Sequence, residues 1–119
     1  MSVLTKDEKK TLSVLAFLLF RMGFDQRAER VYDAIAEMSD PQSSDYRYAQ
    51  TGLAAVEIEI GNGEKALAAV RRAKKGGPLS SREASLWMLE AQALWLQGRK
   101  EEAAVARDQY LYLTGSKKG

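Results

Sequence analysis

The chain has 119 residues, of which 45% are hydrophobic and 29% are charged, with a formal net charge of +2. This is the composition of one folded domain with its own core, and the charge is too small to imply a polyanionic partner such as nucleic acid. The sequence has no cysteine and no histidine, so the commonest metal ligands and general bases are missing. We therefore expect a binding protein rather than an enzyme, with no cofactor and no metal.

The apolar segments of the sequence are short. The longest run, Val14–Phe20, is far below the length that crosses a bilayer. The chain does not open on the cationic, apolar and small-residue pattern of a signal segment. We expect a cytoplasmic protein that does not insert into a membrane.

A first helical hairpin is predicted over about residues 6–39. Thr5 and Glu8 have the spacing of a capping box, which begins a helix. The buried face of this helix is predicted by apolar residues at helical spacing: Leu12, Leu15, Ala16, Leu19 and Met22. Gly23 is expected to end it in the left-handed conformation, and Asp25 to cap the helix that follows.

A second hairpin is predicted over about residues 45–76. Its first helix is expected to be capped by Ser43, Ser44 or Asp45, and its second by Asn62. Apolar residues cover more than one face of the first helix: Leu53, Ala54, Val56, Ile58 and Ile60. Such a helix is typically buried on two sides, as a central helix between neighbours would be.

A third hairpin is predicted over about residues 81–113, followed by a polar tail over 114–119. Ser80 and Glu83 have the spacing of a second capping box at its start. Gly98 is expected to separate its two helices. Strand-like alternation is found nowhere in the sequence, so we predict an all-α domain spanning residues 1–119.

The three hairpins share a repeated pattern. Their turn glycines, Gly23, Gly61 and Gly98, are 38 and 37 residues apart. A small residue stands seven positions before and five after each glycine: Ala16, Ala54, Ala91, Ala28, Ala66 and Ala103. This pattern resembles the tetratricopeptide repeat over nearly the whole chain. The resemblance implies three hairpins stacked as a short right-handed superhelix, although Glu57 and Arg107 stand where the repeat is usually apolar.

In such a superhelix, the first helix of each hairpin lines a concave groove. Residues two, three or six positions before each turn glycine would face the groove, as would Tyr48 and Met88 from earlier turns. The large apolar members of this set are the candidate partner-binding residues: Phe17, Phe20, Tyr48, Ile58, Met88, Trp95 and Leu96. An apolar patch of this size marks a partner site. The alternative, that some of these residues belong to the core between helices, stays open.

Charged patterns in the sequence have structural explanations. A basic cluster at the predicted end of a helix complements the helix dipole and is expected to be solvated: Arg71, Arg72, Lys74 and Lys75. The glycine-rich segment 61–66 lacks the preceding strand of a phosphate-binding loop and is read as a turn. Glu57 and Glu59 lie two residues apart on a helix and point to different sides, so they form no carboxylate pair.

The chain is similar to the small chaperones of bacterial type III secretion, and most to the YscY (SctY) family. The similarity is carried by the opening Leu4-Thr5-Lys6, the helix and Gly-x-x-x-x-Ala turn that follow, and the ending Ala104–Leu113. It implies a non-secreted chaperone that holds an apolar or amphipathic segment of a small, YscX-type export substrate in its groove. The segment would stay soluble and export-competent, and the export gate is a further partner that the resemblance implies.

Three alternatives remain at this point. One is a chaperone of the needle subunit, which would use the same groove. The second is a generic repeat scaffold that self-associates through the same apolar surface, including a homodimer that forms when the partner is missing. The third is an enzyme or a nucleic-acid binder, to which nothing in the sequence points. The groove residues argue against a co-chaperone that grips a C-terminal carboxylate, because those proteins resemble one another in carrying Lys, Arg and Asn in the groove. Here the ligand is expected to be apolar or amphipathic.

Overall fold

The computed structural model describes residues 4–80 and 83–115, and within these ranges the chain is helical without a strand. The helices are α1 (Lys6–Arg21), α2 (Asp25–Glu37), α3 (Ser44–Ile60), α4 (Gly63–Lys74), α5 (Ser85–Leu96) and α6 (Lys100–Thr114). The predicted all-α fold is confirmed. The predicted start of the third hairpin at residue 81 and most of the predicted tail lie outside the described residues. Among the helices described, none has the length and apolar character needed to cross a bilayer.

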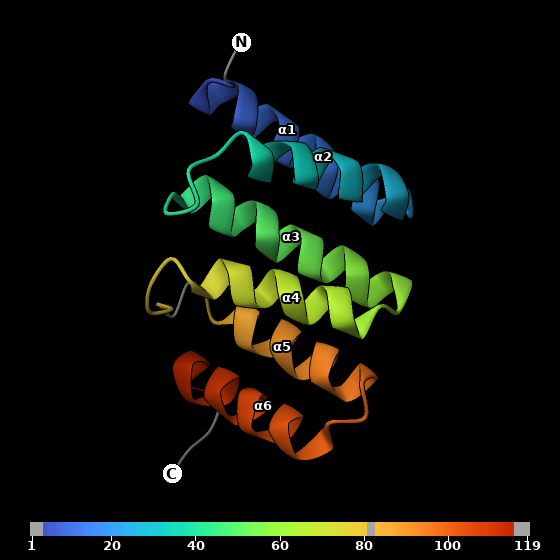
Figure 1. The fold of residues 1–119 in the computed structure, drawn as a ribbon, viewed down its shortest axis with the longest axis vertical. Helices are drawn as coiled ribbons and strands as arrows, with labels where there is room; N and C mark the ends of the chain where they lie inside the picture. Colours follow the sequence, from blue (N-terminus) through green and yellow to red (C-terminus); the bar gives the residue numbers. More distant parts are fainter. Residues whose placement is uncertain (1–3, 81–82, 116–119) are drawn as a thin grey trace.

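The six helices stack in the order of the sequence, along the long axis of a molecule that measures 49 × 26 × 21 Å (Figure 1). Each helix packs against the next one in the chain, and α3 also contacts α1 and α5. Helices α1 and α6 form the two ends of the stack (Figure 1). Consequently α3 and α4 have neighbours on both sides, whereas α1 and α6 are covered on one side by the described chain.

The turn glycines adopt the predicted conformation. Gly23, Gly61 and Gly98 have φ angles of 86°, 93° and 74°, a region that residues with a Cβ atom rarely occupy. The repeat's small residues are all buried, between 0% and 7% exposed: Ala16, Ala28, Ala54, Ala66, Ala91 and Ala103. The left-handed conformation predicted for Gly23 is confirmed, and Gly61 and Gly98 share it. Together with the buried alanines, it explains how paired helices pack closely on either side of each turn.

Three predicted caps are confirmed and one is wrong. The Thr5 hydroxyl accepts a hydrogen bond from the backbone of Glu8 at 3.1 Å, and the Glu8 carboxylate accepts one from the Thr5 backbone at 2.9 Å. Ser43 caps α3 and Asn62 caps α4. Asp25 is not a cap, because α2 begins at Asp25 itself, and in the described chain no side chain caps that helix.

The second predicted capping box is formed in part. The Glu83 carboxylate accepts hydrogen bonds from the Ser80 backbone and hydroxyl at 3.1 and 3.2 Å, and the first of these is one half of a capping box. Helix α5, however, begins at Ser85, after the expected position. The Glu83 carboxylate also pairs with Arg47 at 2.6 Å, and so connects the chain before α5 to α3.

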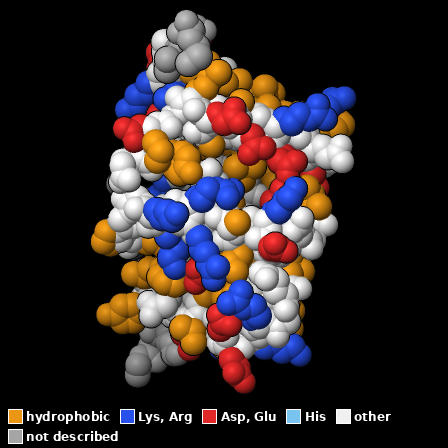
Figure 2. All heavy atoms as spheres, in the orientation of Figure 1, with side chains coloured by type: hydrophobic (Ala, Val, Ile, Leu, Met, Phe, Trp, Pro, Cys, Tyr) orange, Lys and Arg blue, Asp and Glu red, His pale blue; other side chains and the backbone are white. Residues whose placement is uncertain are grey.

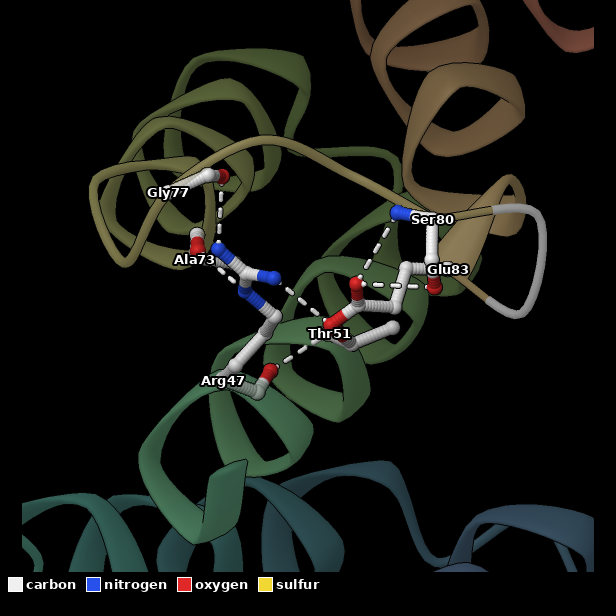
Figure 3. Close-up of polar contacts among 6 residues, drawn as sticks. All are labelled: Arg47, Thr51, Ala73, Gly77, Ser80 and Glu83. Atoms are coloured by element: carbon white, nitrogen blue, oxygen red, sulfur yellow. Dashed lines mark hydrogen bonds and ion pairs between the residues drawn. The ribbon is translucent and has the colours of Figure 1, made fainter. Parts of the chain in front are cut away.

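Arg47 binds the connection between α4 and α5 to α3 (Figure 3). Its Nε donates to the carbonyl of Ala73 at 2.9 Å, its Nη2 to the carbonyl of Gly77 at 2.8 Å, and its Nη1 to Glu83. The planar guanidinium therefore satisfies a helix C-terminus and a loop at once, which an ammonium group could not do in this geometry. We call this set of contacts the Arg47 clamp.

The buried residues form two clusters along the stack, and α1 contributes less to them than the sequence suggests. Leu15 is 44% exposed and Met22 is 67% exposed, so the prediction that both are buried is wrong. The physical reason is the position of α1 at the end of the stack, where its apolar stripe is wider than the surface that α2 and α3 cover. The exposed residues form what we call the α1 outer stripe: Val14, Leu15, Leu18 and Met22.

Two glycines within helices allow close approach between successive hairpins. A Cβ atom on Gly52 of α3 would lie 2.3 Å from Cζ of Tyr32, the aromatic ring that α2 packs against it. A Cβ atom on Gly63 of α4 would lie 2.8 Å from the carbonyl oxygen of Ala93 in α5. These contacts at Gly52 and Gly63 set the spacing between successive hairpins. They therefore also set the distance between the helices that border the candidate site.

Candidate functional site

The larger of two adjoining apolar cavities lies among α3, α5 and α6 and has a volume of 380 Å³. We call it the Trp95 cavity. Its walls are mostly apolar, with cationic side chains from α6. The lining residues are Ile58, Met88, Ala91, Gln92, Trp95, Leu96, Lys100, Ala103, Ala104 and Arg107.

The second cavity has a volume of 360 Å³ and lies further toward the N-terminal end of the stack. We call it the Phe20 cavity. It is lined by Phe17, Phe20, Tyr32, Tyr48, Thr51, Gly52, Ala55, Ser85, Met88, Leu89 and Tyr110. Met88 lines both cavities, so they adjoin at that side chain. We call the two together the apolar groove.

All of the candidate binding residues predicted from the sequence line the apolar groove. Phe17, Phe20, Tyr48 and Met88 line the Phe20 cavity, and Ile58, Met88, Trp95 and Leu96 line the Trp95 cavity. Their burial differs. Trp95 is 60% exposed, and Phe17, Tyr48 and Leu96 are also exposed.

Phe20 and Ile58 also take part in the core. Both are partly buried and pack against the clusters of buried residues that hold the hairpins together. The alternative that some groove residues belong to the core therefore applies to these two side chains, which serve packing and groove at once. Trp95 has no such packing role in the described core and is the better probe of the groove itself.

Several groove residues were not anticipated. The sequence reasoning assigned the groove to the first helix of each hairpin, yet α6, a second helix, contributes Tyr110 to one cavity and Lys100 and Arg107 to the other. One signal was present: Arg107 interrupts the repeat at a usually apolar position. Conversely, Arg21 and Glu59 stand at groove-facing positions of the pattern, but neither lines either of these two cavities.

The charges of the groove have one sign. Among the described residues that line the two cavities, the charged side chains are Lys100 and Arg107. The Lys100 ammonium lies 5.3 Å from the centre of the Trp95 ring, within the range of a cation–π contact. Arg107 is exposed and meets the adjacent Asp108 at 3.5 Å, a long contact between solvated groups that contributes little. The groove can therefore bury apolar surface and attract negative charge.

The basic cluster of α4 is less solvated than the sequence suggests. Lys74 pairs with Glu90 of α5 at 3.0 Å and lies 3.7 Å from the centre of the Trp87 ring. Arg72 donates to the side chain of Gln50 at 3.0 Å. The expectation of a fully solvated cluster is thus wrong for Lys74, which joins two hairpins. Figure 2 shows basic atoms gathered over α4 and acidic atoms over α2.

A buried carboxyl lies beside the acidic surface of α2. Glu57 of α3 is 5% exposed and hydrogen bonds with Glu29 of α2. Burial, followed by this hydrogen bond and the charge of Glu29, raises the pKa of Glu57 to about 7, against the opposing charge of Lys65. The sequence reasoning separated Glu57 from Glu59 but missed this partner on another helix. Among the described residues, no acidic group is arranged to hold a metal ion.

The comparisons with known proteins do not assign the chain to a family. No model of a known protein family matches it, and no curated protein is significantly similar to it. The likeness to type III secretion chaperones consequently rests on the residue pattern, and what that likeness implies about function stays a proposal.

Proposed function

We propose that the chain is a tetratricopeptide-repeat-like chaperone that binds a segment of another protein in the apolar groove. In this proposal, the three hairpins of the chain stack as a short right-handed superhelix. Its supports are the 38- and 37-residue spacing of the turn glycines, their left-handed conformation and the buried alanines around each turn. The linear order of the helices also fits a repeat stack, in which each unit contacts its neighbours.

The observation that carries the proposal is the exposure of large apolar side chains around adjoining cavities. Trp95 is 60% exposed, and Phe17, Tyr48 and Leu96 share the same groove. Leaving such side chains in water costs free energy that a partner recovers by covering them. Aromatic residues of this kind commonly contribute most of the binding free energy in protein interfaces.

The function that follows is physical and not catalytic. An amphipathic segment of the partner would place its apolar face in the groove, which would keep that face from aggregating before the partner is used. The residue pattern that resembles the YscY family supports a small type III export substrate of the YscX type as the partner, in the cytoplasm. In this proposal the chaperone also presents the substrate to the export gate.

A needle-subunit chaperone is the main alternative within the same class, because it would use the same kind of groove. The identity of the bound protein separates the two. Purification of the chain from its native cells, followed by mass spectrometry, should recover a small export substrate. Recovery of the needle subunit would favour the alternative.

A self-associating scaffold is favoured by a different observation. The α1 outer stripe exposes Leu18 and its neighbours at the end of the stack, outside the groove. A scaffold would bury this stripe between copies of the chain. Sedimentation at increasing concentration tests this: a monomer at micromolar concentration argues against the scaffold, and a dimer broken by Leu18→Lys supports it.

The groove is tested with Trp95→Ala and Phe17→Ala, which remove exposed aromatic rings. Each should weaken binding of the purified partner by about 2 kcal/mol, or roughly thirtyfold, because an anchoring ring is lost. Leu18→Ala is the matched control, since Leu18 is also half-exposed but lies outside the groove. Calorimetry gives the affinities, and circular dichroism melts check that each variant is folded. Normal binding by both groove variants would show that the partner binds elsewhere.

A further inference from the structure

The Trp95 cavity combines an apolar wall with two cations from one face of α6. Lys100 and Arg107 are seven residues apart in a continuous helix, so they lie on the same face about two turns, or roughly 10 Å, apart. The space between them is bordered by Ala103 and Ala104, whose small side chains leave the floor of the cavity open. The cations therefore stand at the two ends of an apolar depression.

Among the described residues, Asp108 is the carboxylate that contacts this pair, and its contact with Arg107 is long and solvated. Glu102 is paired with Arg99 at 2.7 Å, and neither residue lines the groove. Asp108 meets Arg107 at 3.5 Å on the solvated surface. Lys100 lies against the Trp95 ring, which holds the ammonium at the rim without cancelling its charge. The cavity thus offers positive charge to whatever fills it.

We propose that the Trp95 cavity takes an apolar pair of residues from a partner helix, flanked by two carboxylates that meet Lys100 and Arg107. In a helix, residues at positions i+3 and i+4 lie on the same face as residues at i and i+7. A segment with acidic residues seven apart and apolar residues between them therefore matches the spacing of the two cations. This inference rests on the proposed function and adds the charge and spacing of the segment that the groove selects.

A protein segment fits the groove better than a small anionic amphiphile. The apolar surface continues past Met88 into the Phe20 cavity, so the two cavities together involve five of the described helices. A helix that lies along the groove can fill both cavities, with the acidic residues at the Trp95 end. The Phe20 cavity has no charged lining residue in the described chain and would accept the apolar continuation of the same segment.

The test uses three synthetic peptides of about 15 residues and the full-length chain. The first peptide carries Glu at positions i and i+7 with Leu at i+3 and i+4, and the others carry Gln or Lys in place of Glu. At low salt the Glu peptide should bind about tenfold more tightly than the Lys peptide, with the Gln peptide between them. The difference should shrink to less than about threefold in roughly 0.5 M salt, because the charges are screened.

Substitutions in the chain assign the preference to the cations. The double variant Lys100→Gln, Arg107→Gln should bind the Glu and Gln peptides equally. The control Arg71→Gln, Lys75→Gln removes one exposed cation of α4 and one directly after its C-terminal end. Neither residue lines a cavity of the groove, so this control should keep the full preference.

The outcomes separate this inference from the proposed function. If all three peptides bind in the groove with equal affinity at low salt, the charge preference is overturned and the chaperone function still stands. Binding of none of the peptides would also overturn it, and the function would then be decided by the Trp95→Ala variant with the native partner. Equal peptide affinities together with cosedimentation on phosphatidylglycerol vesicles would assign the groove to a membrane surface and overturn the inference.

Discussion

The junction between the first and second hairpins and the junction between the second and third are both built on a helical glycine, but their polar groups differ. At the first, Gly52 of α3 receives the ring of Tyr32, and the carboxyls of Glu57 and Glu29 meet. At the second, Gly63 of α4 approaches α5, and the polar contacts are attractive: Lys74 pairs with Glu90, Gln97 donates to the Gly63 carbonyl, and the Arg47 clamp holds the connection.

The first and third hairpins are therefore attached to the second hairpin by different interactions. The first hairpin is attached by apolar packing that two ionised carboxyls would oppose. The third hairpin, which carries Trp95 and the cations of the groove, is attached by packing and by paired charges. Under the proposed function, these contacts would hold the Trp95 cavity in one geometry before a partner binds, which would lower the ordering cost of binding. Each junction can be perturbed separately.

The largest effect is expected at Gly52. A valine there would overlap the buried Tyr32 ring, since even its Cβ atom would lie 2.3 Å from Cζ. Overpacking of this kind should lower the free energy of unfolding by about 3 kcal/mol in chemical denaturation. In a Tyr32→Leu background, the same change should cost less than about 1.5 kcal/mol, because the ring is gone. An equal cost in both backgrounds would mean that the Tyr32 contact does not limit the first junction.

A somewhat smaller effect is expected at the second junction. Arg47→Met removes the clamp: Glu83 loses its cationic partner, and two carbonyl groups lose the hydrogen bonds that Arg47 donates. This should cost about 2 to 3 kcal/mol of unfolding free energy. Arg47→Lys should recover less than half of this loss, because an ammonium cannot reproduce the forked geometry. The exposed Arg71→Met in α4 is the matched control. Full recovery by lysine would show that charge alone, and not the fork, holds the connection.

The smallest effect is a dependence of stability on pH at the first junction. The pKa of Glu57 is raised to about 7 in the folded chain, above its value of about 4.5 when unfolded, so the folded state binds this proton more tightly. The contribution is fully present below about pH 4.5 and is lost as the pH rises through 7. Between about pH 5 and 8, it should lower the unfolding free energy by roughly 1 to 2 kcal/mol.

Glu57→Gln should remove this component of the pH dependence and leave the chain more stable than the parent at about pH 8. The groups that face Glu57 are Glu29 and Asp33 from α2 and Lys65 from α4, and all remain in the variant. Glu59→Gln, on the exposed side of the same helix, is the control and should keep the parent's slope. Denaturant titrations at several pH values measure it, and identical slopes for the two variants would contradict the role of Glu57.

Local patterns in the sequence determined the helices and their turns. Glycines at regular spacing, the caps at Thr5, Ser43 and Asn62, and alanines placed around each turn act within one hairpin, so their consequences can be derived from neighbouring residues. The large apolar residues that line the groove were also identified in this way, because the repeat pattern fixes which face of α1, α3 and α5 they occupy. The charge of the groove was missed, since it comes from α6.

Tertiary structure alone decided the features that join distant residues. Arg47 meets Glu83 thirty-six positions away, and Glu57 meets Glu29 on another helix, pairings that depend on the rotation and spacing of helices set by Gly52 and Gly63. The exposure of Leu15 and Met22 has the same origin. Their helical spacing predicts an apolar face but not how much of it a neighbour covers, and at the end of the stack α1 has neighbours on one side of it.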